Sequence, residues 1–270
     1  MAATGRAGRL RASIPPGWRE RASPAVEYAA APLAARRPRQ RFVIVCGPRT
    51  GSELLRELLD SLPGVRCEGE LLQRAPGWPL AYLNGRAVLG GRGGAAWGCK
   101  VLDSHLHLGL AQSRPPGDRL LAELVAGGWS IVNLRRRDLL AQALSYAHAM
   151  QDQWHFRAAS RFDRFEADTA AVIALLHVLD GNARWLDERL AEVPHTTVSY
   201  EDDLRQPVSR EATLSRLAGL LGVAPARASS DLRAVAPERP ENRITNFDEL
   251  AAALAHTRFA PLVGDGAEGG

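Results

Sequence analysis

Residues 41–60 constrain the fold more than any other part of this 270-residue chain. A continuous apolar run, residues 42–46 (FVIVC), is typical of a strand buried on both faces of a parallel sheet. The turn at 47–51 (GPRTG) follows. Residues 52–60 then carry leucines at helical spacing. A buried strand, a tight glycine turn and a helix together predict an α/β fold.

The rest of the chain continues this alternation. We expect strands at 96–102, 129–134 and 195–200, and helices at 118–126, 139–150, 165–193 and 209–221, the long one interrupted near Gly181. Residues 84–95 are rich in glycine and predict a loop. Alternating strands and helices predict one domain with a P-loop-type parallel sheet flanked by helices on both faces. Right-handed crossovers then bring the carboxyl ends of the strands to one edge.

The ends of the chain differ from this domain, which we expect to span residues 41–262. Residues 1–40 hold eight arginines and five prolines without a helical or strand period, which predicts a flexible basic extension. A flexible tail is expected at 263–270. No apolar run reaches the roughly 18 residues that cross a bilayer, and no secretory signal is evident.

Cysteine content and charge exclude several classes of protein. Three cysteines without a CxxC motif argue against a disulfide scaffold and a zinc ribbon, and favour a soluble protein of a reducing compartment, the cytoplasm. The net charge is only +4, and the basic residues of the extension lack interleaved aromatics, so a nucleic-acid partner is not expected.

The basic residues are unusual because 33 of the 34 are arginine and Lys100 is the only lysine. We attribute this bias to GC-rich coding, which replaces lysine wherever arginine serves equally well. A surviving lysine then marks a position where a compact ammonium is needed rather than a planar guanidinium. The alternative is that one lysine survived by chance.

The first turn is a candidate anion site. Backbone N–H groups at the start of the following helix carry partial positive charge, and Gly51 lets the backbone approach a ligand closely. Thr50 and Ser52 add hydroxyl donors, and Arg49 adds a forked cation. The alternative is an ordinary turn capped by Ser52. The loop lacks the lysine of a Walker A motif, since Glu53 stands near its position.

The string RFVIVCGPRTGS (41–52) resembles the opening of the PAPS-dependent sulfotransferases, most closely the bacterial carbohydrate type that includes the trehalose and nodulation-factor enzymes. The resemblance implies that Arg49, Thr50, Gly51 and Ser52 hold the 5′-phosphosulfate of PAPS, with PAP as the product. The family usually has threonine where this chain has Glu53. A carboxylate beside a bound dianion is repelled unless it points away, so Glu53 leaves the strength of donor binding open.

Residues 131–145 (IVNLRRRDLLAQALS) carry the second similarity. They are similar to the bacterial pattern RxDxxxQAxS, which implies that Arg136 and Ser145 bind the 3′-phosphate. The spacing in cytosolic sulfotransferases favours Arg137 instead. Arginines at a helix start oppose the helix dipole and so need another reason to be there. The alternative is a solvated basic cluster.

Two further segments resemble the acceptor side of this family. The similarity of residues 67–72 (CEGELL) implies that Glu70 takes the proton of the acceptor hydroxyl, and Glu68 is the second candidate for this base. The alternative is that both are surface glutamates in a loop. The segment WGCK (97–100) implies that Lys100 stabilises charge on the transferring group and the leaving oxygen. His105 and His107 would share one side of a strand, but no further ligands complete a metal site, and no metal is expected.

These observations predict a sulfotransferase that moves a sulfuryl group from PAPS to an acceptor hydroxyl, with the bacterial resemblance favouring a carbohydrate or a glycosylated metabolite. The alternatives are a P-loop kinase of a small metabolite and a non-catalytic nucleotide-binding protein.

The remaining features of the sequence say less about function, and the sequence carries no signal of the oligomeric state. Residues 200–204 (YEDDL) resemble the YEDL segment at a strand end in this family and are expected to be structural. Arg239 or Arg243 is a further candidate at the donor. Aromatic residues that could line an acceptor pocket or the core are Trp78, Tyr82, Trp154, Phe156 and Trp185.

Overall fold

The computed structural model describes residues 25–33, 37–74, 78–91, 94–107, 117–152, 163–232 and 239–264. Within them lies one sheet made of β1 (Gln40–Cys46), β2 (Val65–Glu70), β3 (Ala96–Leu102), β4 (Trp129–Arg135) and β5 (Thr196–Ser199). The strand order is β2-β3-β1-β4-β5, and all neighbouring strands are parallel. The expected parallel α/β fold is confirmed.

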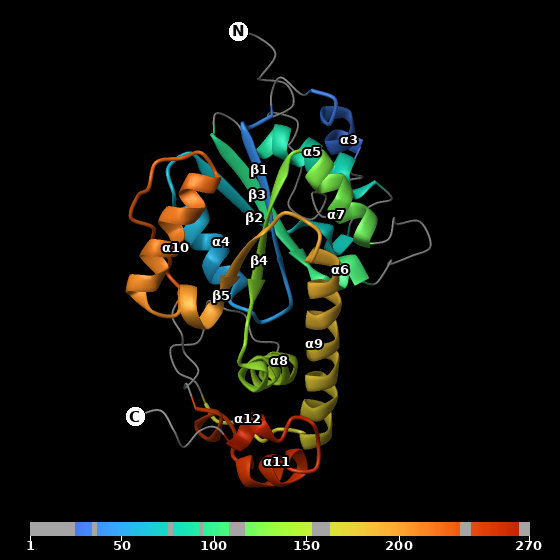
Figure 1. The fold of residues 1–270 in the computed structure, drawn as a ribbon, viewed down its shortest axis with the longest axis vertical. Coiled ribbons are helices and arrows are strands. Elements are labelled where there is room, and N and C mark those ends of the chain that lie inside the picture. The colour runs from blue at the N-terminus through green and yellow to red at the C-terminus, as the bar shows by residue number, and fades with distance from the viewer. Residues whose placement is uncertain are drawn as a thin grey trace.

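Helices cover both faces of the sheet (Figure 1). On one face, Phe42 and Ile44 of β1 pack with apolar residues of α4 (Ser52–Asp60) and α10 (Pro207–Leu220). On the other face, Val43 and Val45 pack with α5 (Pro79–Gly90), α7 (Gly117–Ala126) and the C-terminal part of α9 (Thr169–Leu190). Alternate residues of β1 thus face two separate cores, which explains its continuous apolar run.

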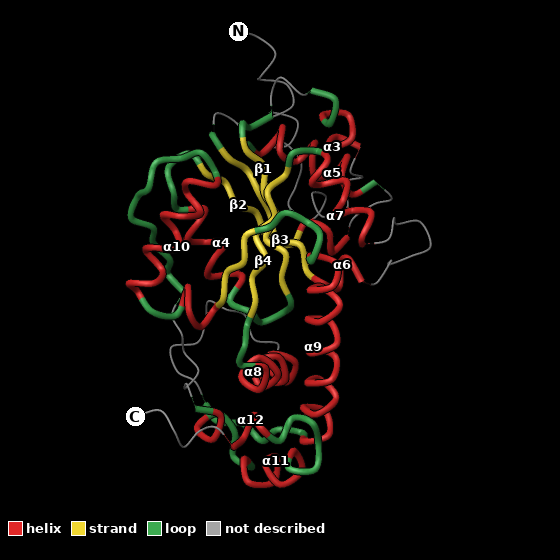
Figure 2. Tube along the Cα trace, in the orientation of Figure 1, coloured by secondary structure: helices red, strands yellow, loops and turns green. Residues whose placement is uncertain are grey.

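A third apolar cluster lies beyond the carboxyl ends of the strands (Figure 2). It joins α8 (Leu139–Asp152) to α9 and α11 (Phe247–Leu254), with α12 (Pro261–Gly264) beside them. Asp168 is the N-cap of α9, and its side chain accepts a hydrogen bond from the amide of Ala171 at 3.0 Å. This cluster places α8 directly below the first turn, where the candidate residues lie.

Three local predictions were wrong. α5 continues through residues 84–90, which were expected to form a loop, because Gly85 packs against the backbone of α3 (Ala25–Ala30). A Cβ at Gly85 would lie 1.8 Å from the carbonyl oxygen of Glu27, so glycine here permits close packing. α9 is continuous at Gly181. The short helix α6 (Asp103–His107) replaces the strand expected to carry the two histidines.

The helix α3 lies before the expected start of the domain at residue 41. Glu27 of α3 is buried, and its carboxylate lies 3.6 Å from the guanidinium of Arg86 on α5. Part of the N-terminal region is therefore packed against the sheet domain (Figure 1). Among the described residues, none of the helices is long and apolar enough to cross a bilayer.

Candidate functional site

The turn after β1 adopts an unusual backbone conformation. Arg49 has φ 60° and Gly51 has φ 87°, both in the left-handed region, which costs a non-glycine residue about 1–2 kcal/mol. Two hydrogen bonds support the turn: Thr50 Oγ1 donates to the Gly47 carbonyl at 3.0 Å, and Gln142 Nε2 donates to the Pro48 carbonyl at 2.6 Å. Strain of this kind is concentrated at functional sites.

Ser52 does not cap α4 in the way that the ordinary-turn alternative requires. The N-cap residue is Gly51, and no side chain accepts a hydrogen bond from the first turn of the helix. Ser52 is the first helical residue and is buried. The start of α4 therefore keeps backbone donors that no side-chain cap occupies, as an anion site requires.

The two segments that sequence similarity singled out meet in space. Arg49 Nε donates to Ser145 Oγ at 2.9 Å, and Arg136 Nη1 donates to the Arg49 carbonyl at 3.0 Å. Arg137 points elsewhere: it is exposed and pairs with Asp202 at 2.5 Å. Of the two arginines considered for the second segment, Arg136 is the one that reaches the turn.

Positive charge accumulates at this junction. Burial, reinforced by the charge of Arg136, lowers the pKa of Arg49 to about 10. Arg243 is buried, and Nη1 donates to the Ala141 carbonyl at 3.1 Å; burial and the charge of Arg136 lower its pKa as well. Arg136 Nε is buried and makes no hydrogen bond to a described residue, although Glu201 Oε1 lies 3.8 Å from it. Three neighbouring guanidinium groups that repel one another favour an anionic ligand.

Tyr200 contacts both segments, a relationship that the sequence did not predict. The Arg136 guanidinium lies over its ring, 4.8 Å from the centroid, and a Cβ at Gly51 would lie 2.4 Å from the ring. Tyr200 begins a π-helical turn, Tyr200–Leu204, a rare geometry that is frequent at functional sites. In the same turn, Glu201 accepts hydrogen bonds from the amides of Arg137 and Asp138 at 3.0 and 3.2 Å. The similarity of YEDDL to a family segment was the available signal.

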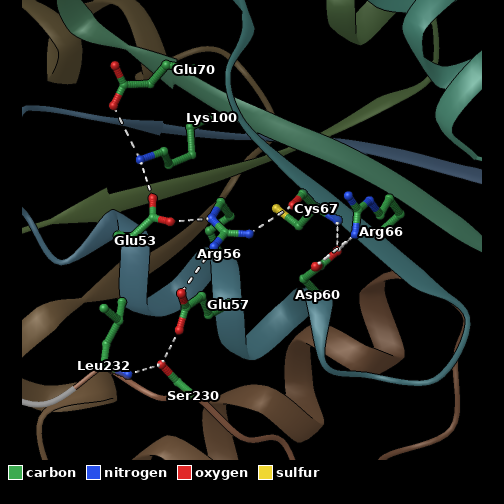
Figure 3. Close-up of polar contacts among 10 residues, drawn as sticks. All are labelled: Glu53, Arg56, Glu57, Asp60, Arg66, Cys67, Glu70, Lys100, Ser230 and Leu232. Atoms are coloured by element: carbon green, nitrogen blue, oxygen red, sulfur yellow. Dashed lines mark hydrogen bonds and ion pairs between the residues drawn. The ribbon is translucent and has the colours of Figure 1, made fainter. Parts of the chain in front are cut away.

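Lys100 lies between two carboxylates (Figure 3). Its Nζ is 2.8 Å from Glu53 Oε2 and 3.3 Å from Glu70 Oε1, and its side chain is 7% exposed. Glu53 also accepts from Arg56 Nε at 2.6 Å. Although burial opposes it, the hydrogen bond and charge of Glu53 raise the pKa of Lys100. Burial alone would raise the pKa of Glu53, but the hydrogen bonds and charges of Lys100 and Arg56 outweigh it, so the pKa is lowered.

The two glutamates of β2 have different environments. Glu68 pairs with Arg86 and accepts a hydrogen bond from Trp97 Nε1 at 3.2 Å. A register shift between Glu68 and Glu70 sets Glu70 opposite Lys100 on β3. The Glu70 side chain is 31% exposed, against 13% for Glu68. Glu70 is therefore the carboxylate of β2 that is both near Lys100 and open to solvent.

The other candidates are dispersed. His105 Nδ1 accepts from the amide of Leu102 at 3.1 Å, and the described residues contain no group of three or more ligands suited to a metal. Tyr82 and Trp185 pack against the core, whereas Trp78 is 73% exposed. Trp154 and Phe156 lie outside the described residues. Arg239 is exposed and lies 3.8 Å from Glu241.

The chain is similar to two known proteins, one in sequence and one in structure. The chain is 28% identical over 261 residues to Nodulation protein H of Rhizobium meliloti (strain 1021). The alignment covers 84% of this chain and 98% of that protein. A crystal structure of a sulfotransferase from Alicyclobacillus acidocaldarius matches 84% of this chain and 93% of its own, with a TM-score of 0.47 and 18% identity. No family model matches the chain. The sequence relative bears out the resemblance of this chain to the bacterial sulfotransferases.

Proposed function

We propose that this chain, a relative of the bacterial sulfotransferases, transfers a sulfuryl group from PAPS to an acceptor hydroxyl. The observation that carries the proposal is the junction of Arg49, Arg136 and Ser145. The 3′- and 5′-phosphates of PAPS are attached to one ribose, so the residues that bind them have to be neighbours. Two segments about ninety residues apart meet in this way.

The residues of the junction fit a doubly phosphorylated nucleotide. Ser52 and the first amides of α4 suit the phosphosulfate end, since they combine donors with the partial positive charge of the helix. Arg136 and Ser145 suit the 3′-phosphate. The buried Nε of Arg136 lies 3.8 Å from Glu201 Oε1 and makes no hydrogen bond to a described residue, so it can donate to a phosphate oxygen. Burial and the neighbouring charge of Arg136 together lower the pKa of Arg49, and a bound anion would offset both effects.

In the proposed reaction, Glu70 accepts the proton of the acceptor hydroxyl as its oxygen attacks sulfur. One S–O bond forms to the acceptor, and the S–O bond to the 5′-phosphate breaks in line with it. Lys100 and Arg49 stabilise the charge that develops on the leaving phosphate oxygen, and PAP is released. Catalysis then comes mainly from orientation and charge stabilisation, as in phosphoryl transfer.

We propose a carbohydrate or a glycosylated metabolite as the acceptor, since the resemblance of the sequence is to bacterial enzymes of that type. Glu70 is open to solvent, which suits a hydroxyl presented by a bulky acceptor. The exposed Trp78 contacts Tyr28 edge-on, with ring centroids 5.9 Å apart, and this pair offers a surface on which a sugar ring could stack.

The proposal is tested with purified protein, radiolabelled PAPS and a panel of sugars and glycosides. We expect label transfer to at least one hydroxyl acceptor, and an increase in melting temperature with PAP but not with ATP and Mg²⁺. A melting temperature that responds only to ATP and Mg²⁺ would favour a small-metabolite kinase. PAP binding without transfer to any acceptor would favour a non-catalytic nucleotide-binding protein.

A further inference from the structure

Lys100 is held by carboxylates that belong to two different elements. Glu53 comes from the first turn of α4, and Glu70 comes from the end of β2 (Figure 3). The shorter contact, 2.8 Å, is with Glu53, and it is a hydrogen bond as well as an ion pair. The candidate site for the anionic end of the donor therefore contains an anionic side chain of the protein itself.

Resting on the proposed function, we propose that Glu53 is a positioning residue that occupies Lys100 in the nucleotide-free protein and that the donor must displace from it. Glu53 thereby sets the affinity for the donor. When the phosphosulfate group arrives, the Lys100 ammonium exchanges one oxygen anion for another. No covalent bond changes in this step.

The contacts of Glu53 favour exchange over proton transfer. Two cations hold its carboxylate, Lys100 through Oε2 and Arg56 through Oε1, so both oxygens already accept hydrogen bonds. The pKa of Glu53 is lowered, which makes it a weak base. Glu70 makes a longer contact with Lys100, 3.3 Å.

Arg56, the second partner of Glu53, lowers the free-energy cost of separating Glu53 from Lys100. Arg56 lies one helical turn after Glu53, and its Nη1 lies 3.4 Å from the Cys67 carbonyl, which anchors it to β2. Glu53 therefore keeps an ion pair with Arg56 after Lys100 has moved to the donor. The exchange breaks one of two ion pairs and leaves no isolated carboxylate in a half-buried position.

The chain offers an unusual way to observe this exchange, since Lys100 is the only lysine. Protein grown with ¹³C- and ¹⁵N-labelled lysine gives one ammonium nitrogen (Nζ) signal, which belongs to Lys100. A pH titration of that signal without nucleotide reports the groups that surround the ammonium, namely Glu53, Glu70 and the Cys46 thiol. We expect Glu53→Gln to lower the pKa of Lys100 and Glu57→Gln to leave it unchanged.

Glu57→Gln is the matched control. Glu57 lies on the same helix and pairs with the same Arg56, but its bonds run to Arg56 and Ser230 rather than to Lys100. Each variant removes one negative charge from α4. Thermal unfolding of both variants checks that they are folded.

Calorimetric titration with PAP then tests the competition. We expect Glu53→Gln to bind PAP roughly ten-fold more tightly than the unmodified protein, equivalent to about 1.4 kcal/mol, and Glu57→Gln to bind it unchanged. In a Lys100→Met background the gain from Glu53→Gln should fall to about two-fold or less, because the effect acts through Lys100.

The outcomes separate this inference from the proposed function. Equal affinity of the unmodified protein and Glu53→Gln for PAP, or a gain that persists without Lys100, would overturn the exchange and leave the sulfotransferase proposal standing. If neither protein binds PAP, the proposed function fails, and the inference fails with it. PAP binding that appears only in Glu53→Gln supports the exchange in its strongest form.

Discussion

Arg49 Nε lies 2.9 Å from Ser145 Oγ, although 96 residues separate them in the chain. The hydrogen bond joins the turn after β1 to the first helix after β4, because these two strands are neighbours in the sheet. A ligand that binds one of these segments is therefore in reach of the other. Variants on either side should then affect the same binding event.

The neighbouring arginines of the second segment should differ sharply in their effect. We expect Arg136→Gln to weaken PAP binding by about 10–100-fold, because charged hydrogen bonds to a phosphate contribute roughly 1.5–3 kcal/mol. Arg137→Gln should change the affinity less than about two-fold, since Arg137 is exposed and pairs with Asp202. Calorimetric titration of both variants measures the difference. An equal loss in the two variants would contradict the assignment of Arg136.

The two glutamates of β2 should separate catalysis from stability. We expect Glu70→Gln to lower kcat by about 10²–10⁴-fold with little change in PAP affinity, as for loss of a general base. Glu68→Gln should instead lower the free energy of unfolding by about 1–3 kcal/mol, because it weakens the partly buried pair with Arg86, which keeps Glu27 as a second partner. Transfer rates and urea unfolding of both variants test this. A fully active Glu70→Gln would exclude Glu70 as the base.

Glycine at position 51 should be required for both conformation and space. Gly51→Ala places a Cβ against the Tyr200 ring at a positive φ, so we expect a loss of at least about 1–2 kcal/mol in stability. Gly181→Ala is the control, since no atom lies within 4 Å of a Cβ there; inside α9 it should stabilise by about 0.5–1 kcal/mol. Urea unfolding compares them. A neutral Gly51→Ala would show that the turn can relax.

The ion pair between Glu53 and Lys100 predicts a dependence of stability on pH. The pKa of Glu53 is lowered from 4.5, so its contribution is complete above that value and is lost as pH falls through the lowered pKa. The pKa of Lys100 is raised from 10.5, so its contribution is complete below that value and is lost as pH rises through the raised pKa. The difference in unfolding free energy between the unmodified protein and Glu53→Gln should therefore be largest at neutral pH and shrink as the pH falls below 4.5 and through the lowered pKa of Glu53. A difference that grows on acidification would contradict the pairing.

Much of the fold could be predicted because its signals are local. The apolar run of β1 and the leucines of α4 predicted both elements, since burial on two faces and helical spacing each leave a pattern within a few residues. The observed β3, β4, α8 and α10 also lie close to their expected ranges. β2 was missed because the sequence VRCEGE has little apolar character.

The errors came from residues whose neighbours are distant in the chain. The glycines of residues 84–90 suggested a loop, but Gly85 is helical because α3 packs against it. The position of Tyr200 against Gly51 and Arg136 has no local signature either. Glu53 stood out only as a departure from a familiar pattern, and its two cationic partners could not be read from the chain.

By itself, the sequence determined the α/β class, the first turn and the segments that supply the candidate residues, because backbone propensity and hydrophobic period act between near neighbours. The tertiary structure alone decided that Arg136 rather than Arg137 reaches the turn, that Glu70 rather than Glu68 faces Lys100, and that Glu53 shares that lysine. These choices depend on strand order, register and a bulge, which arise from packing between segments far apart in the chain.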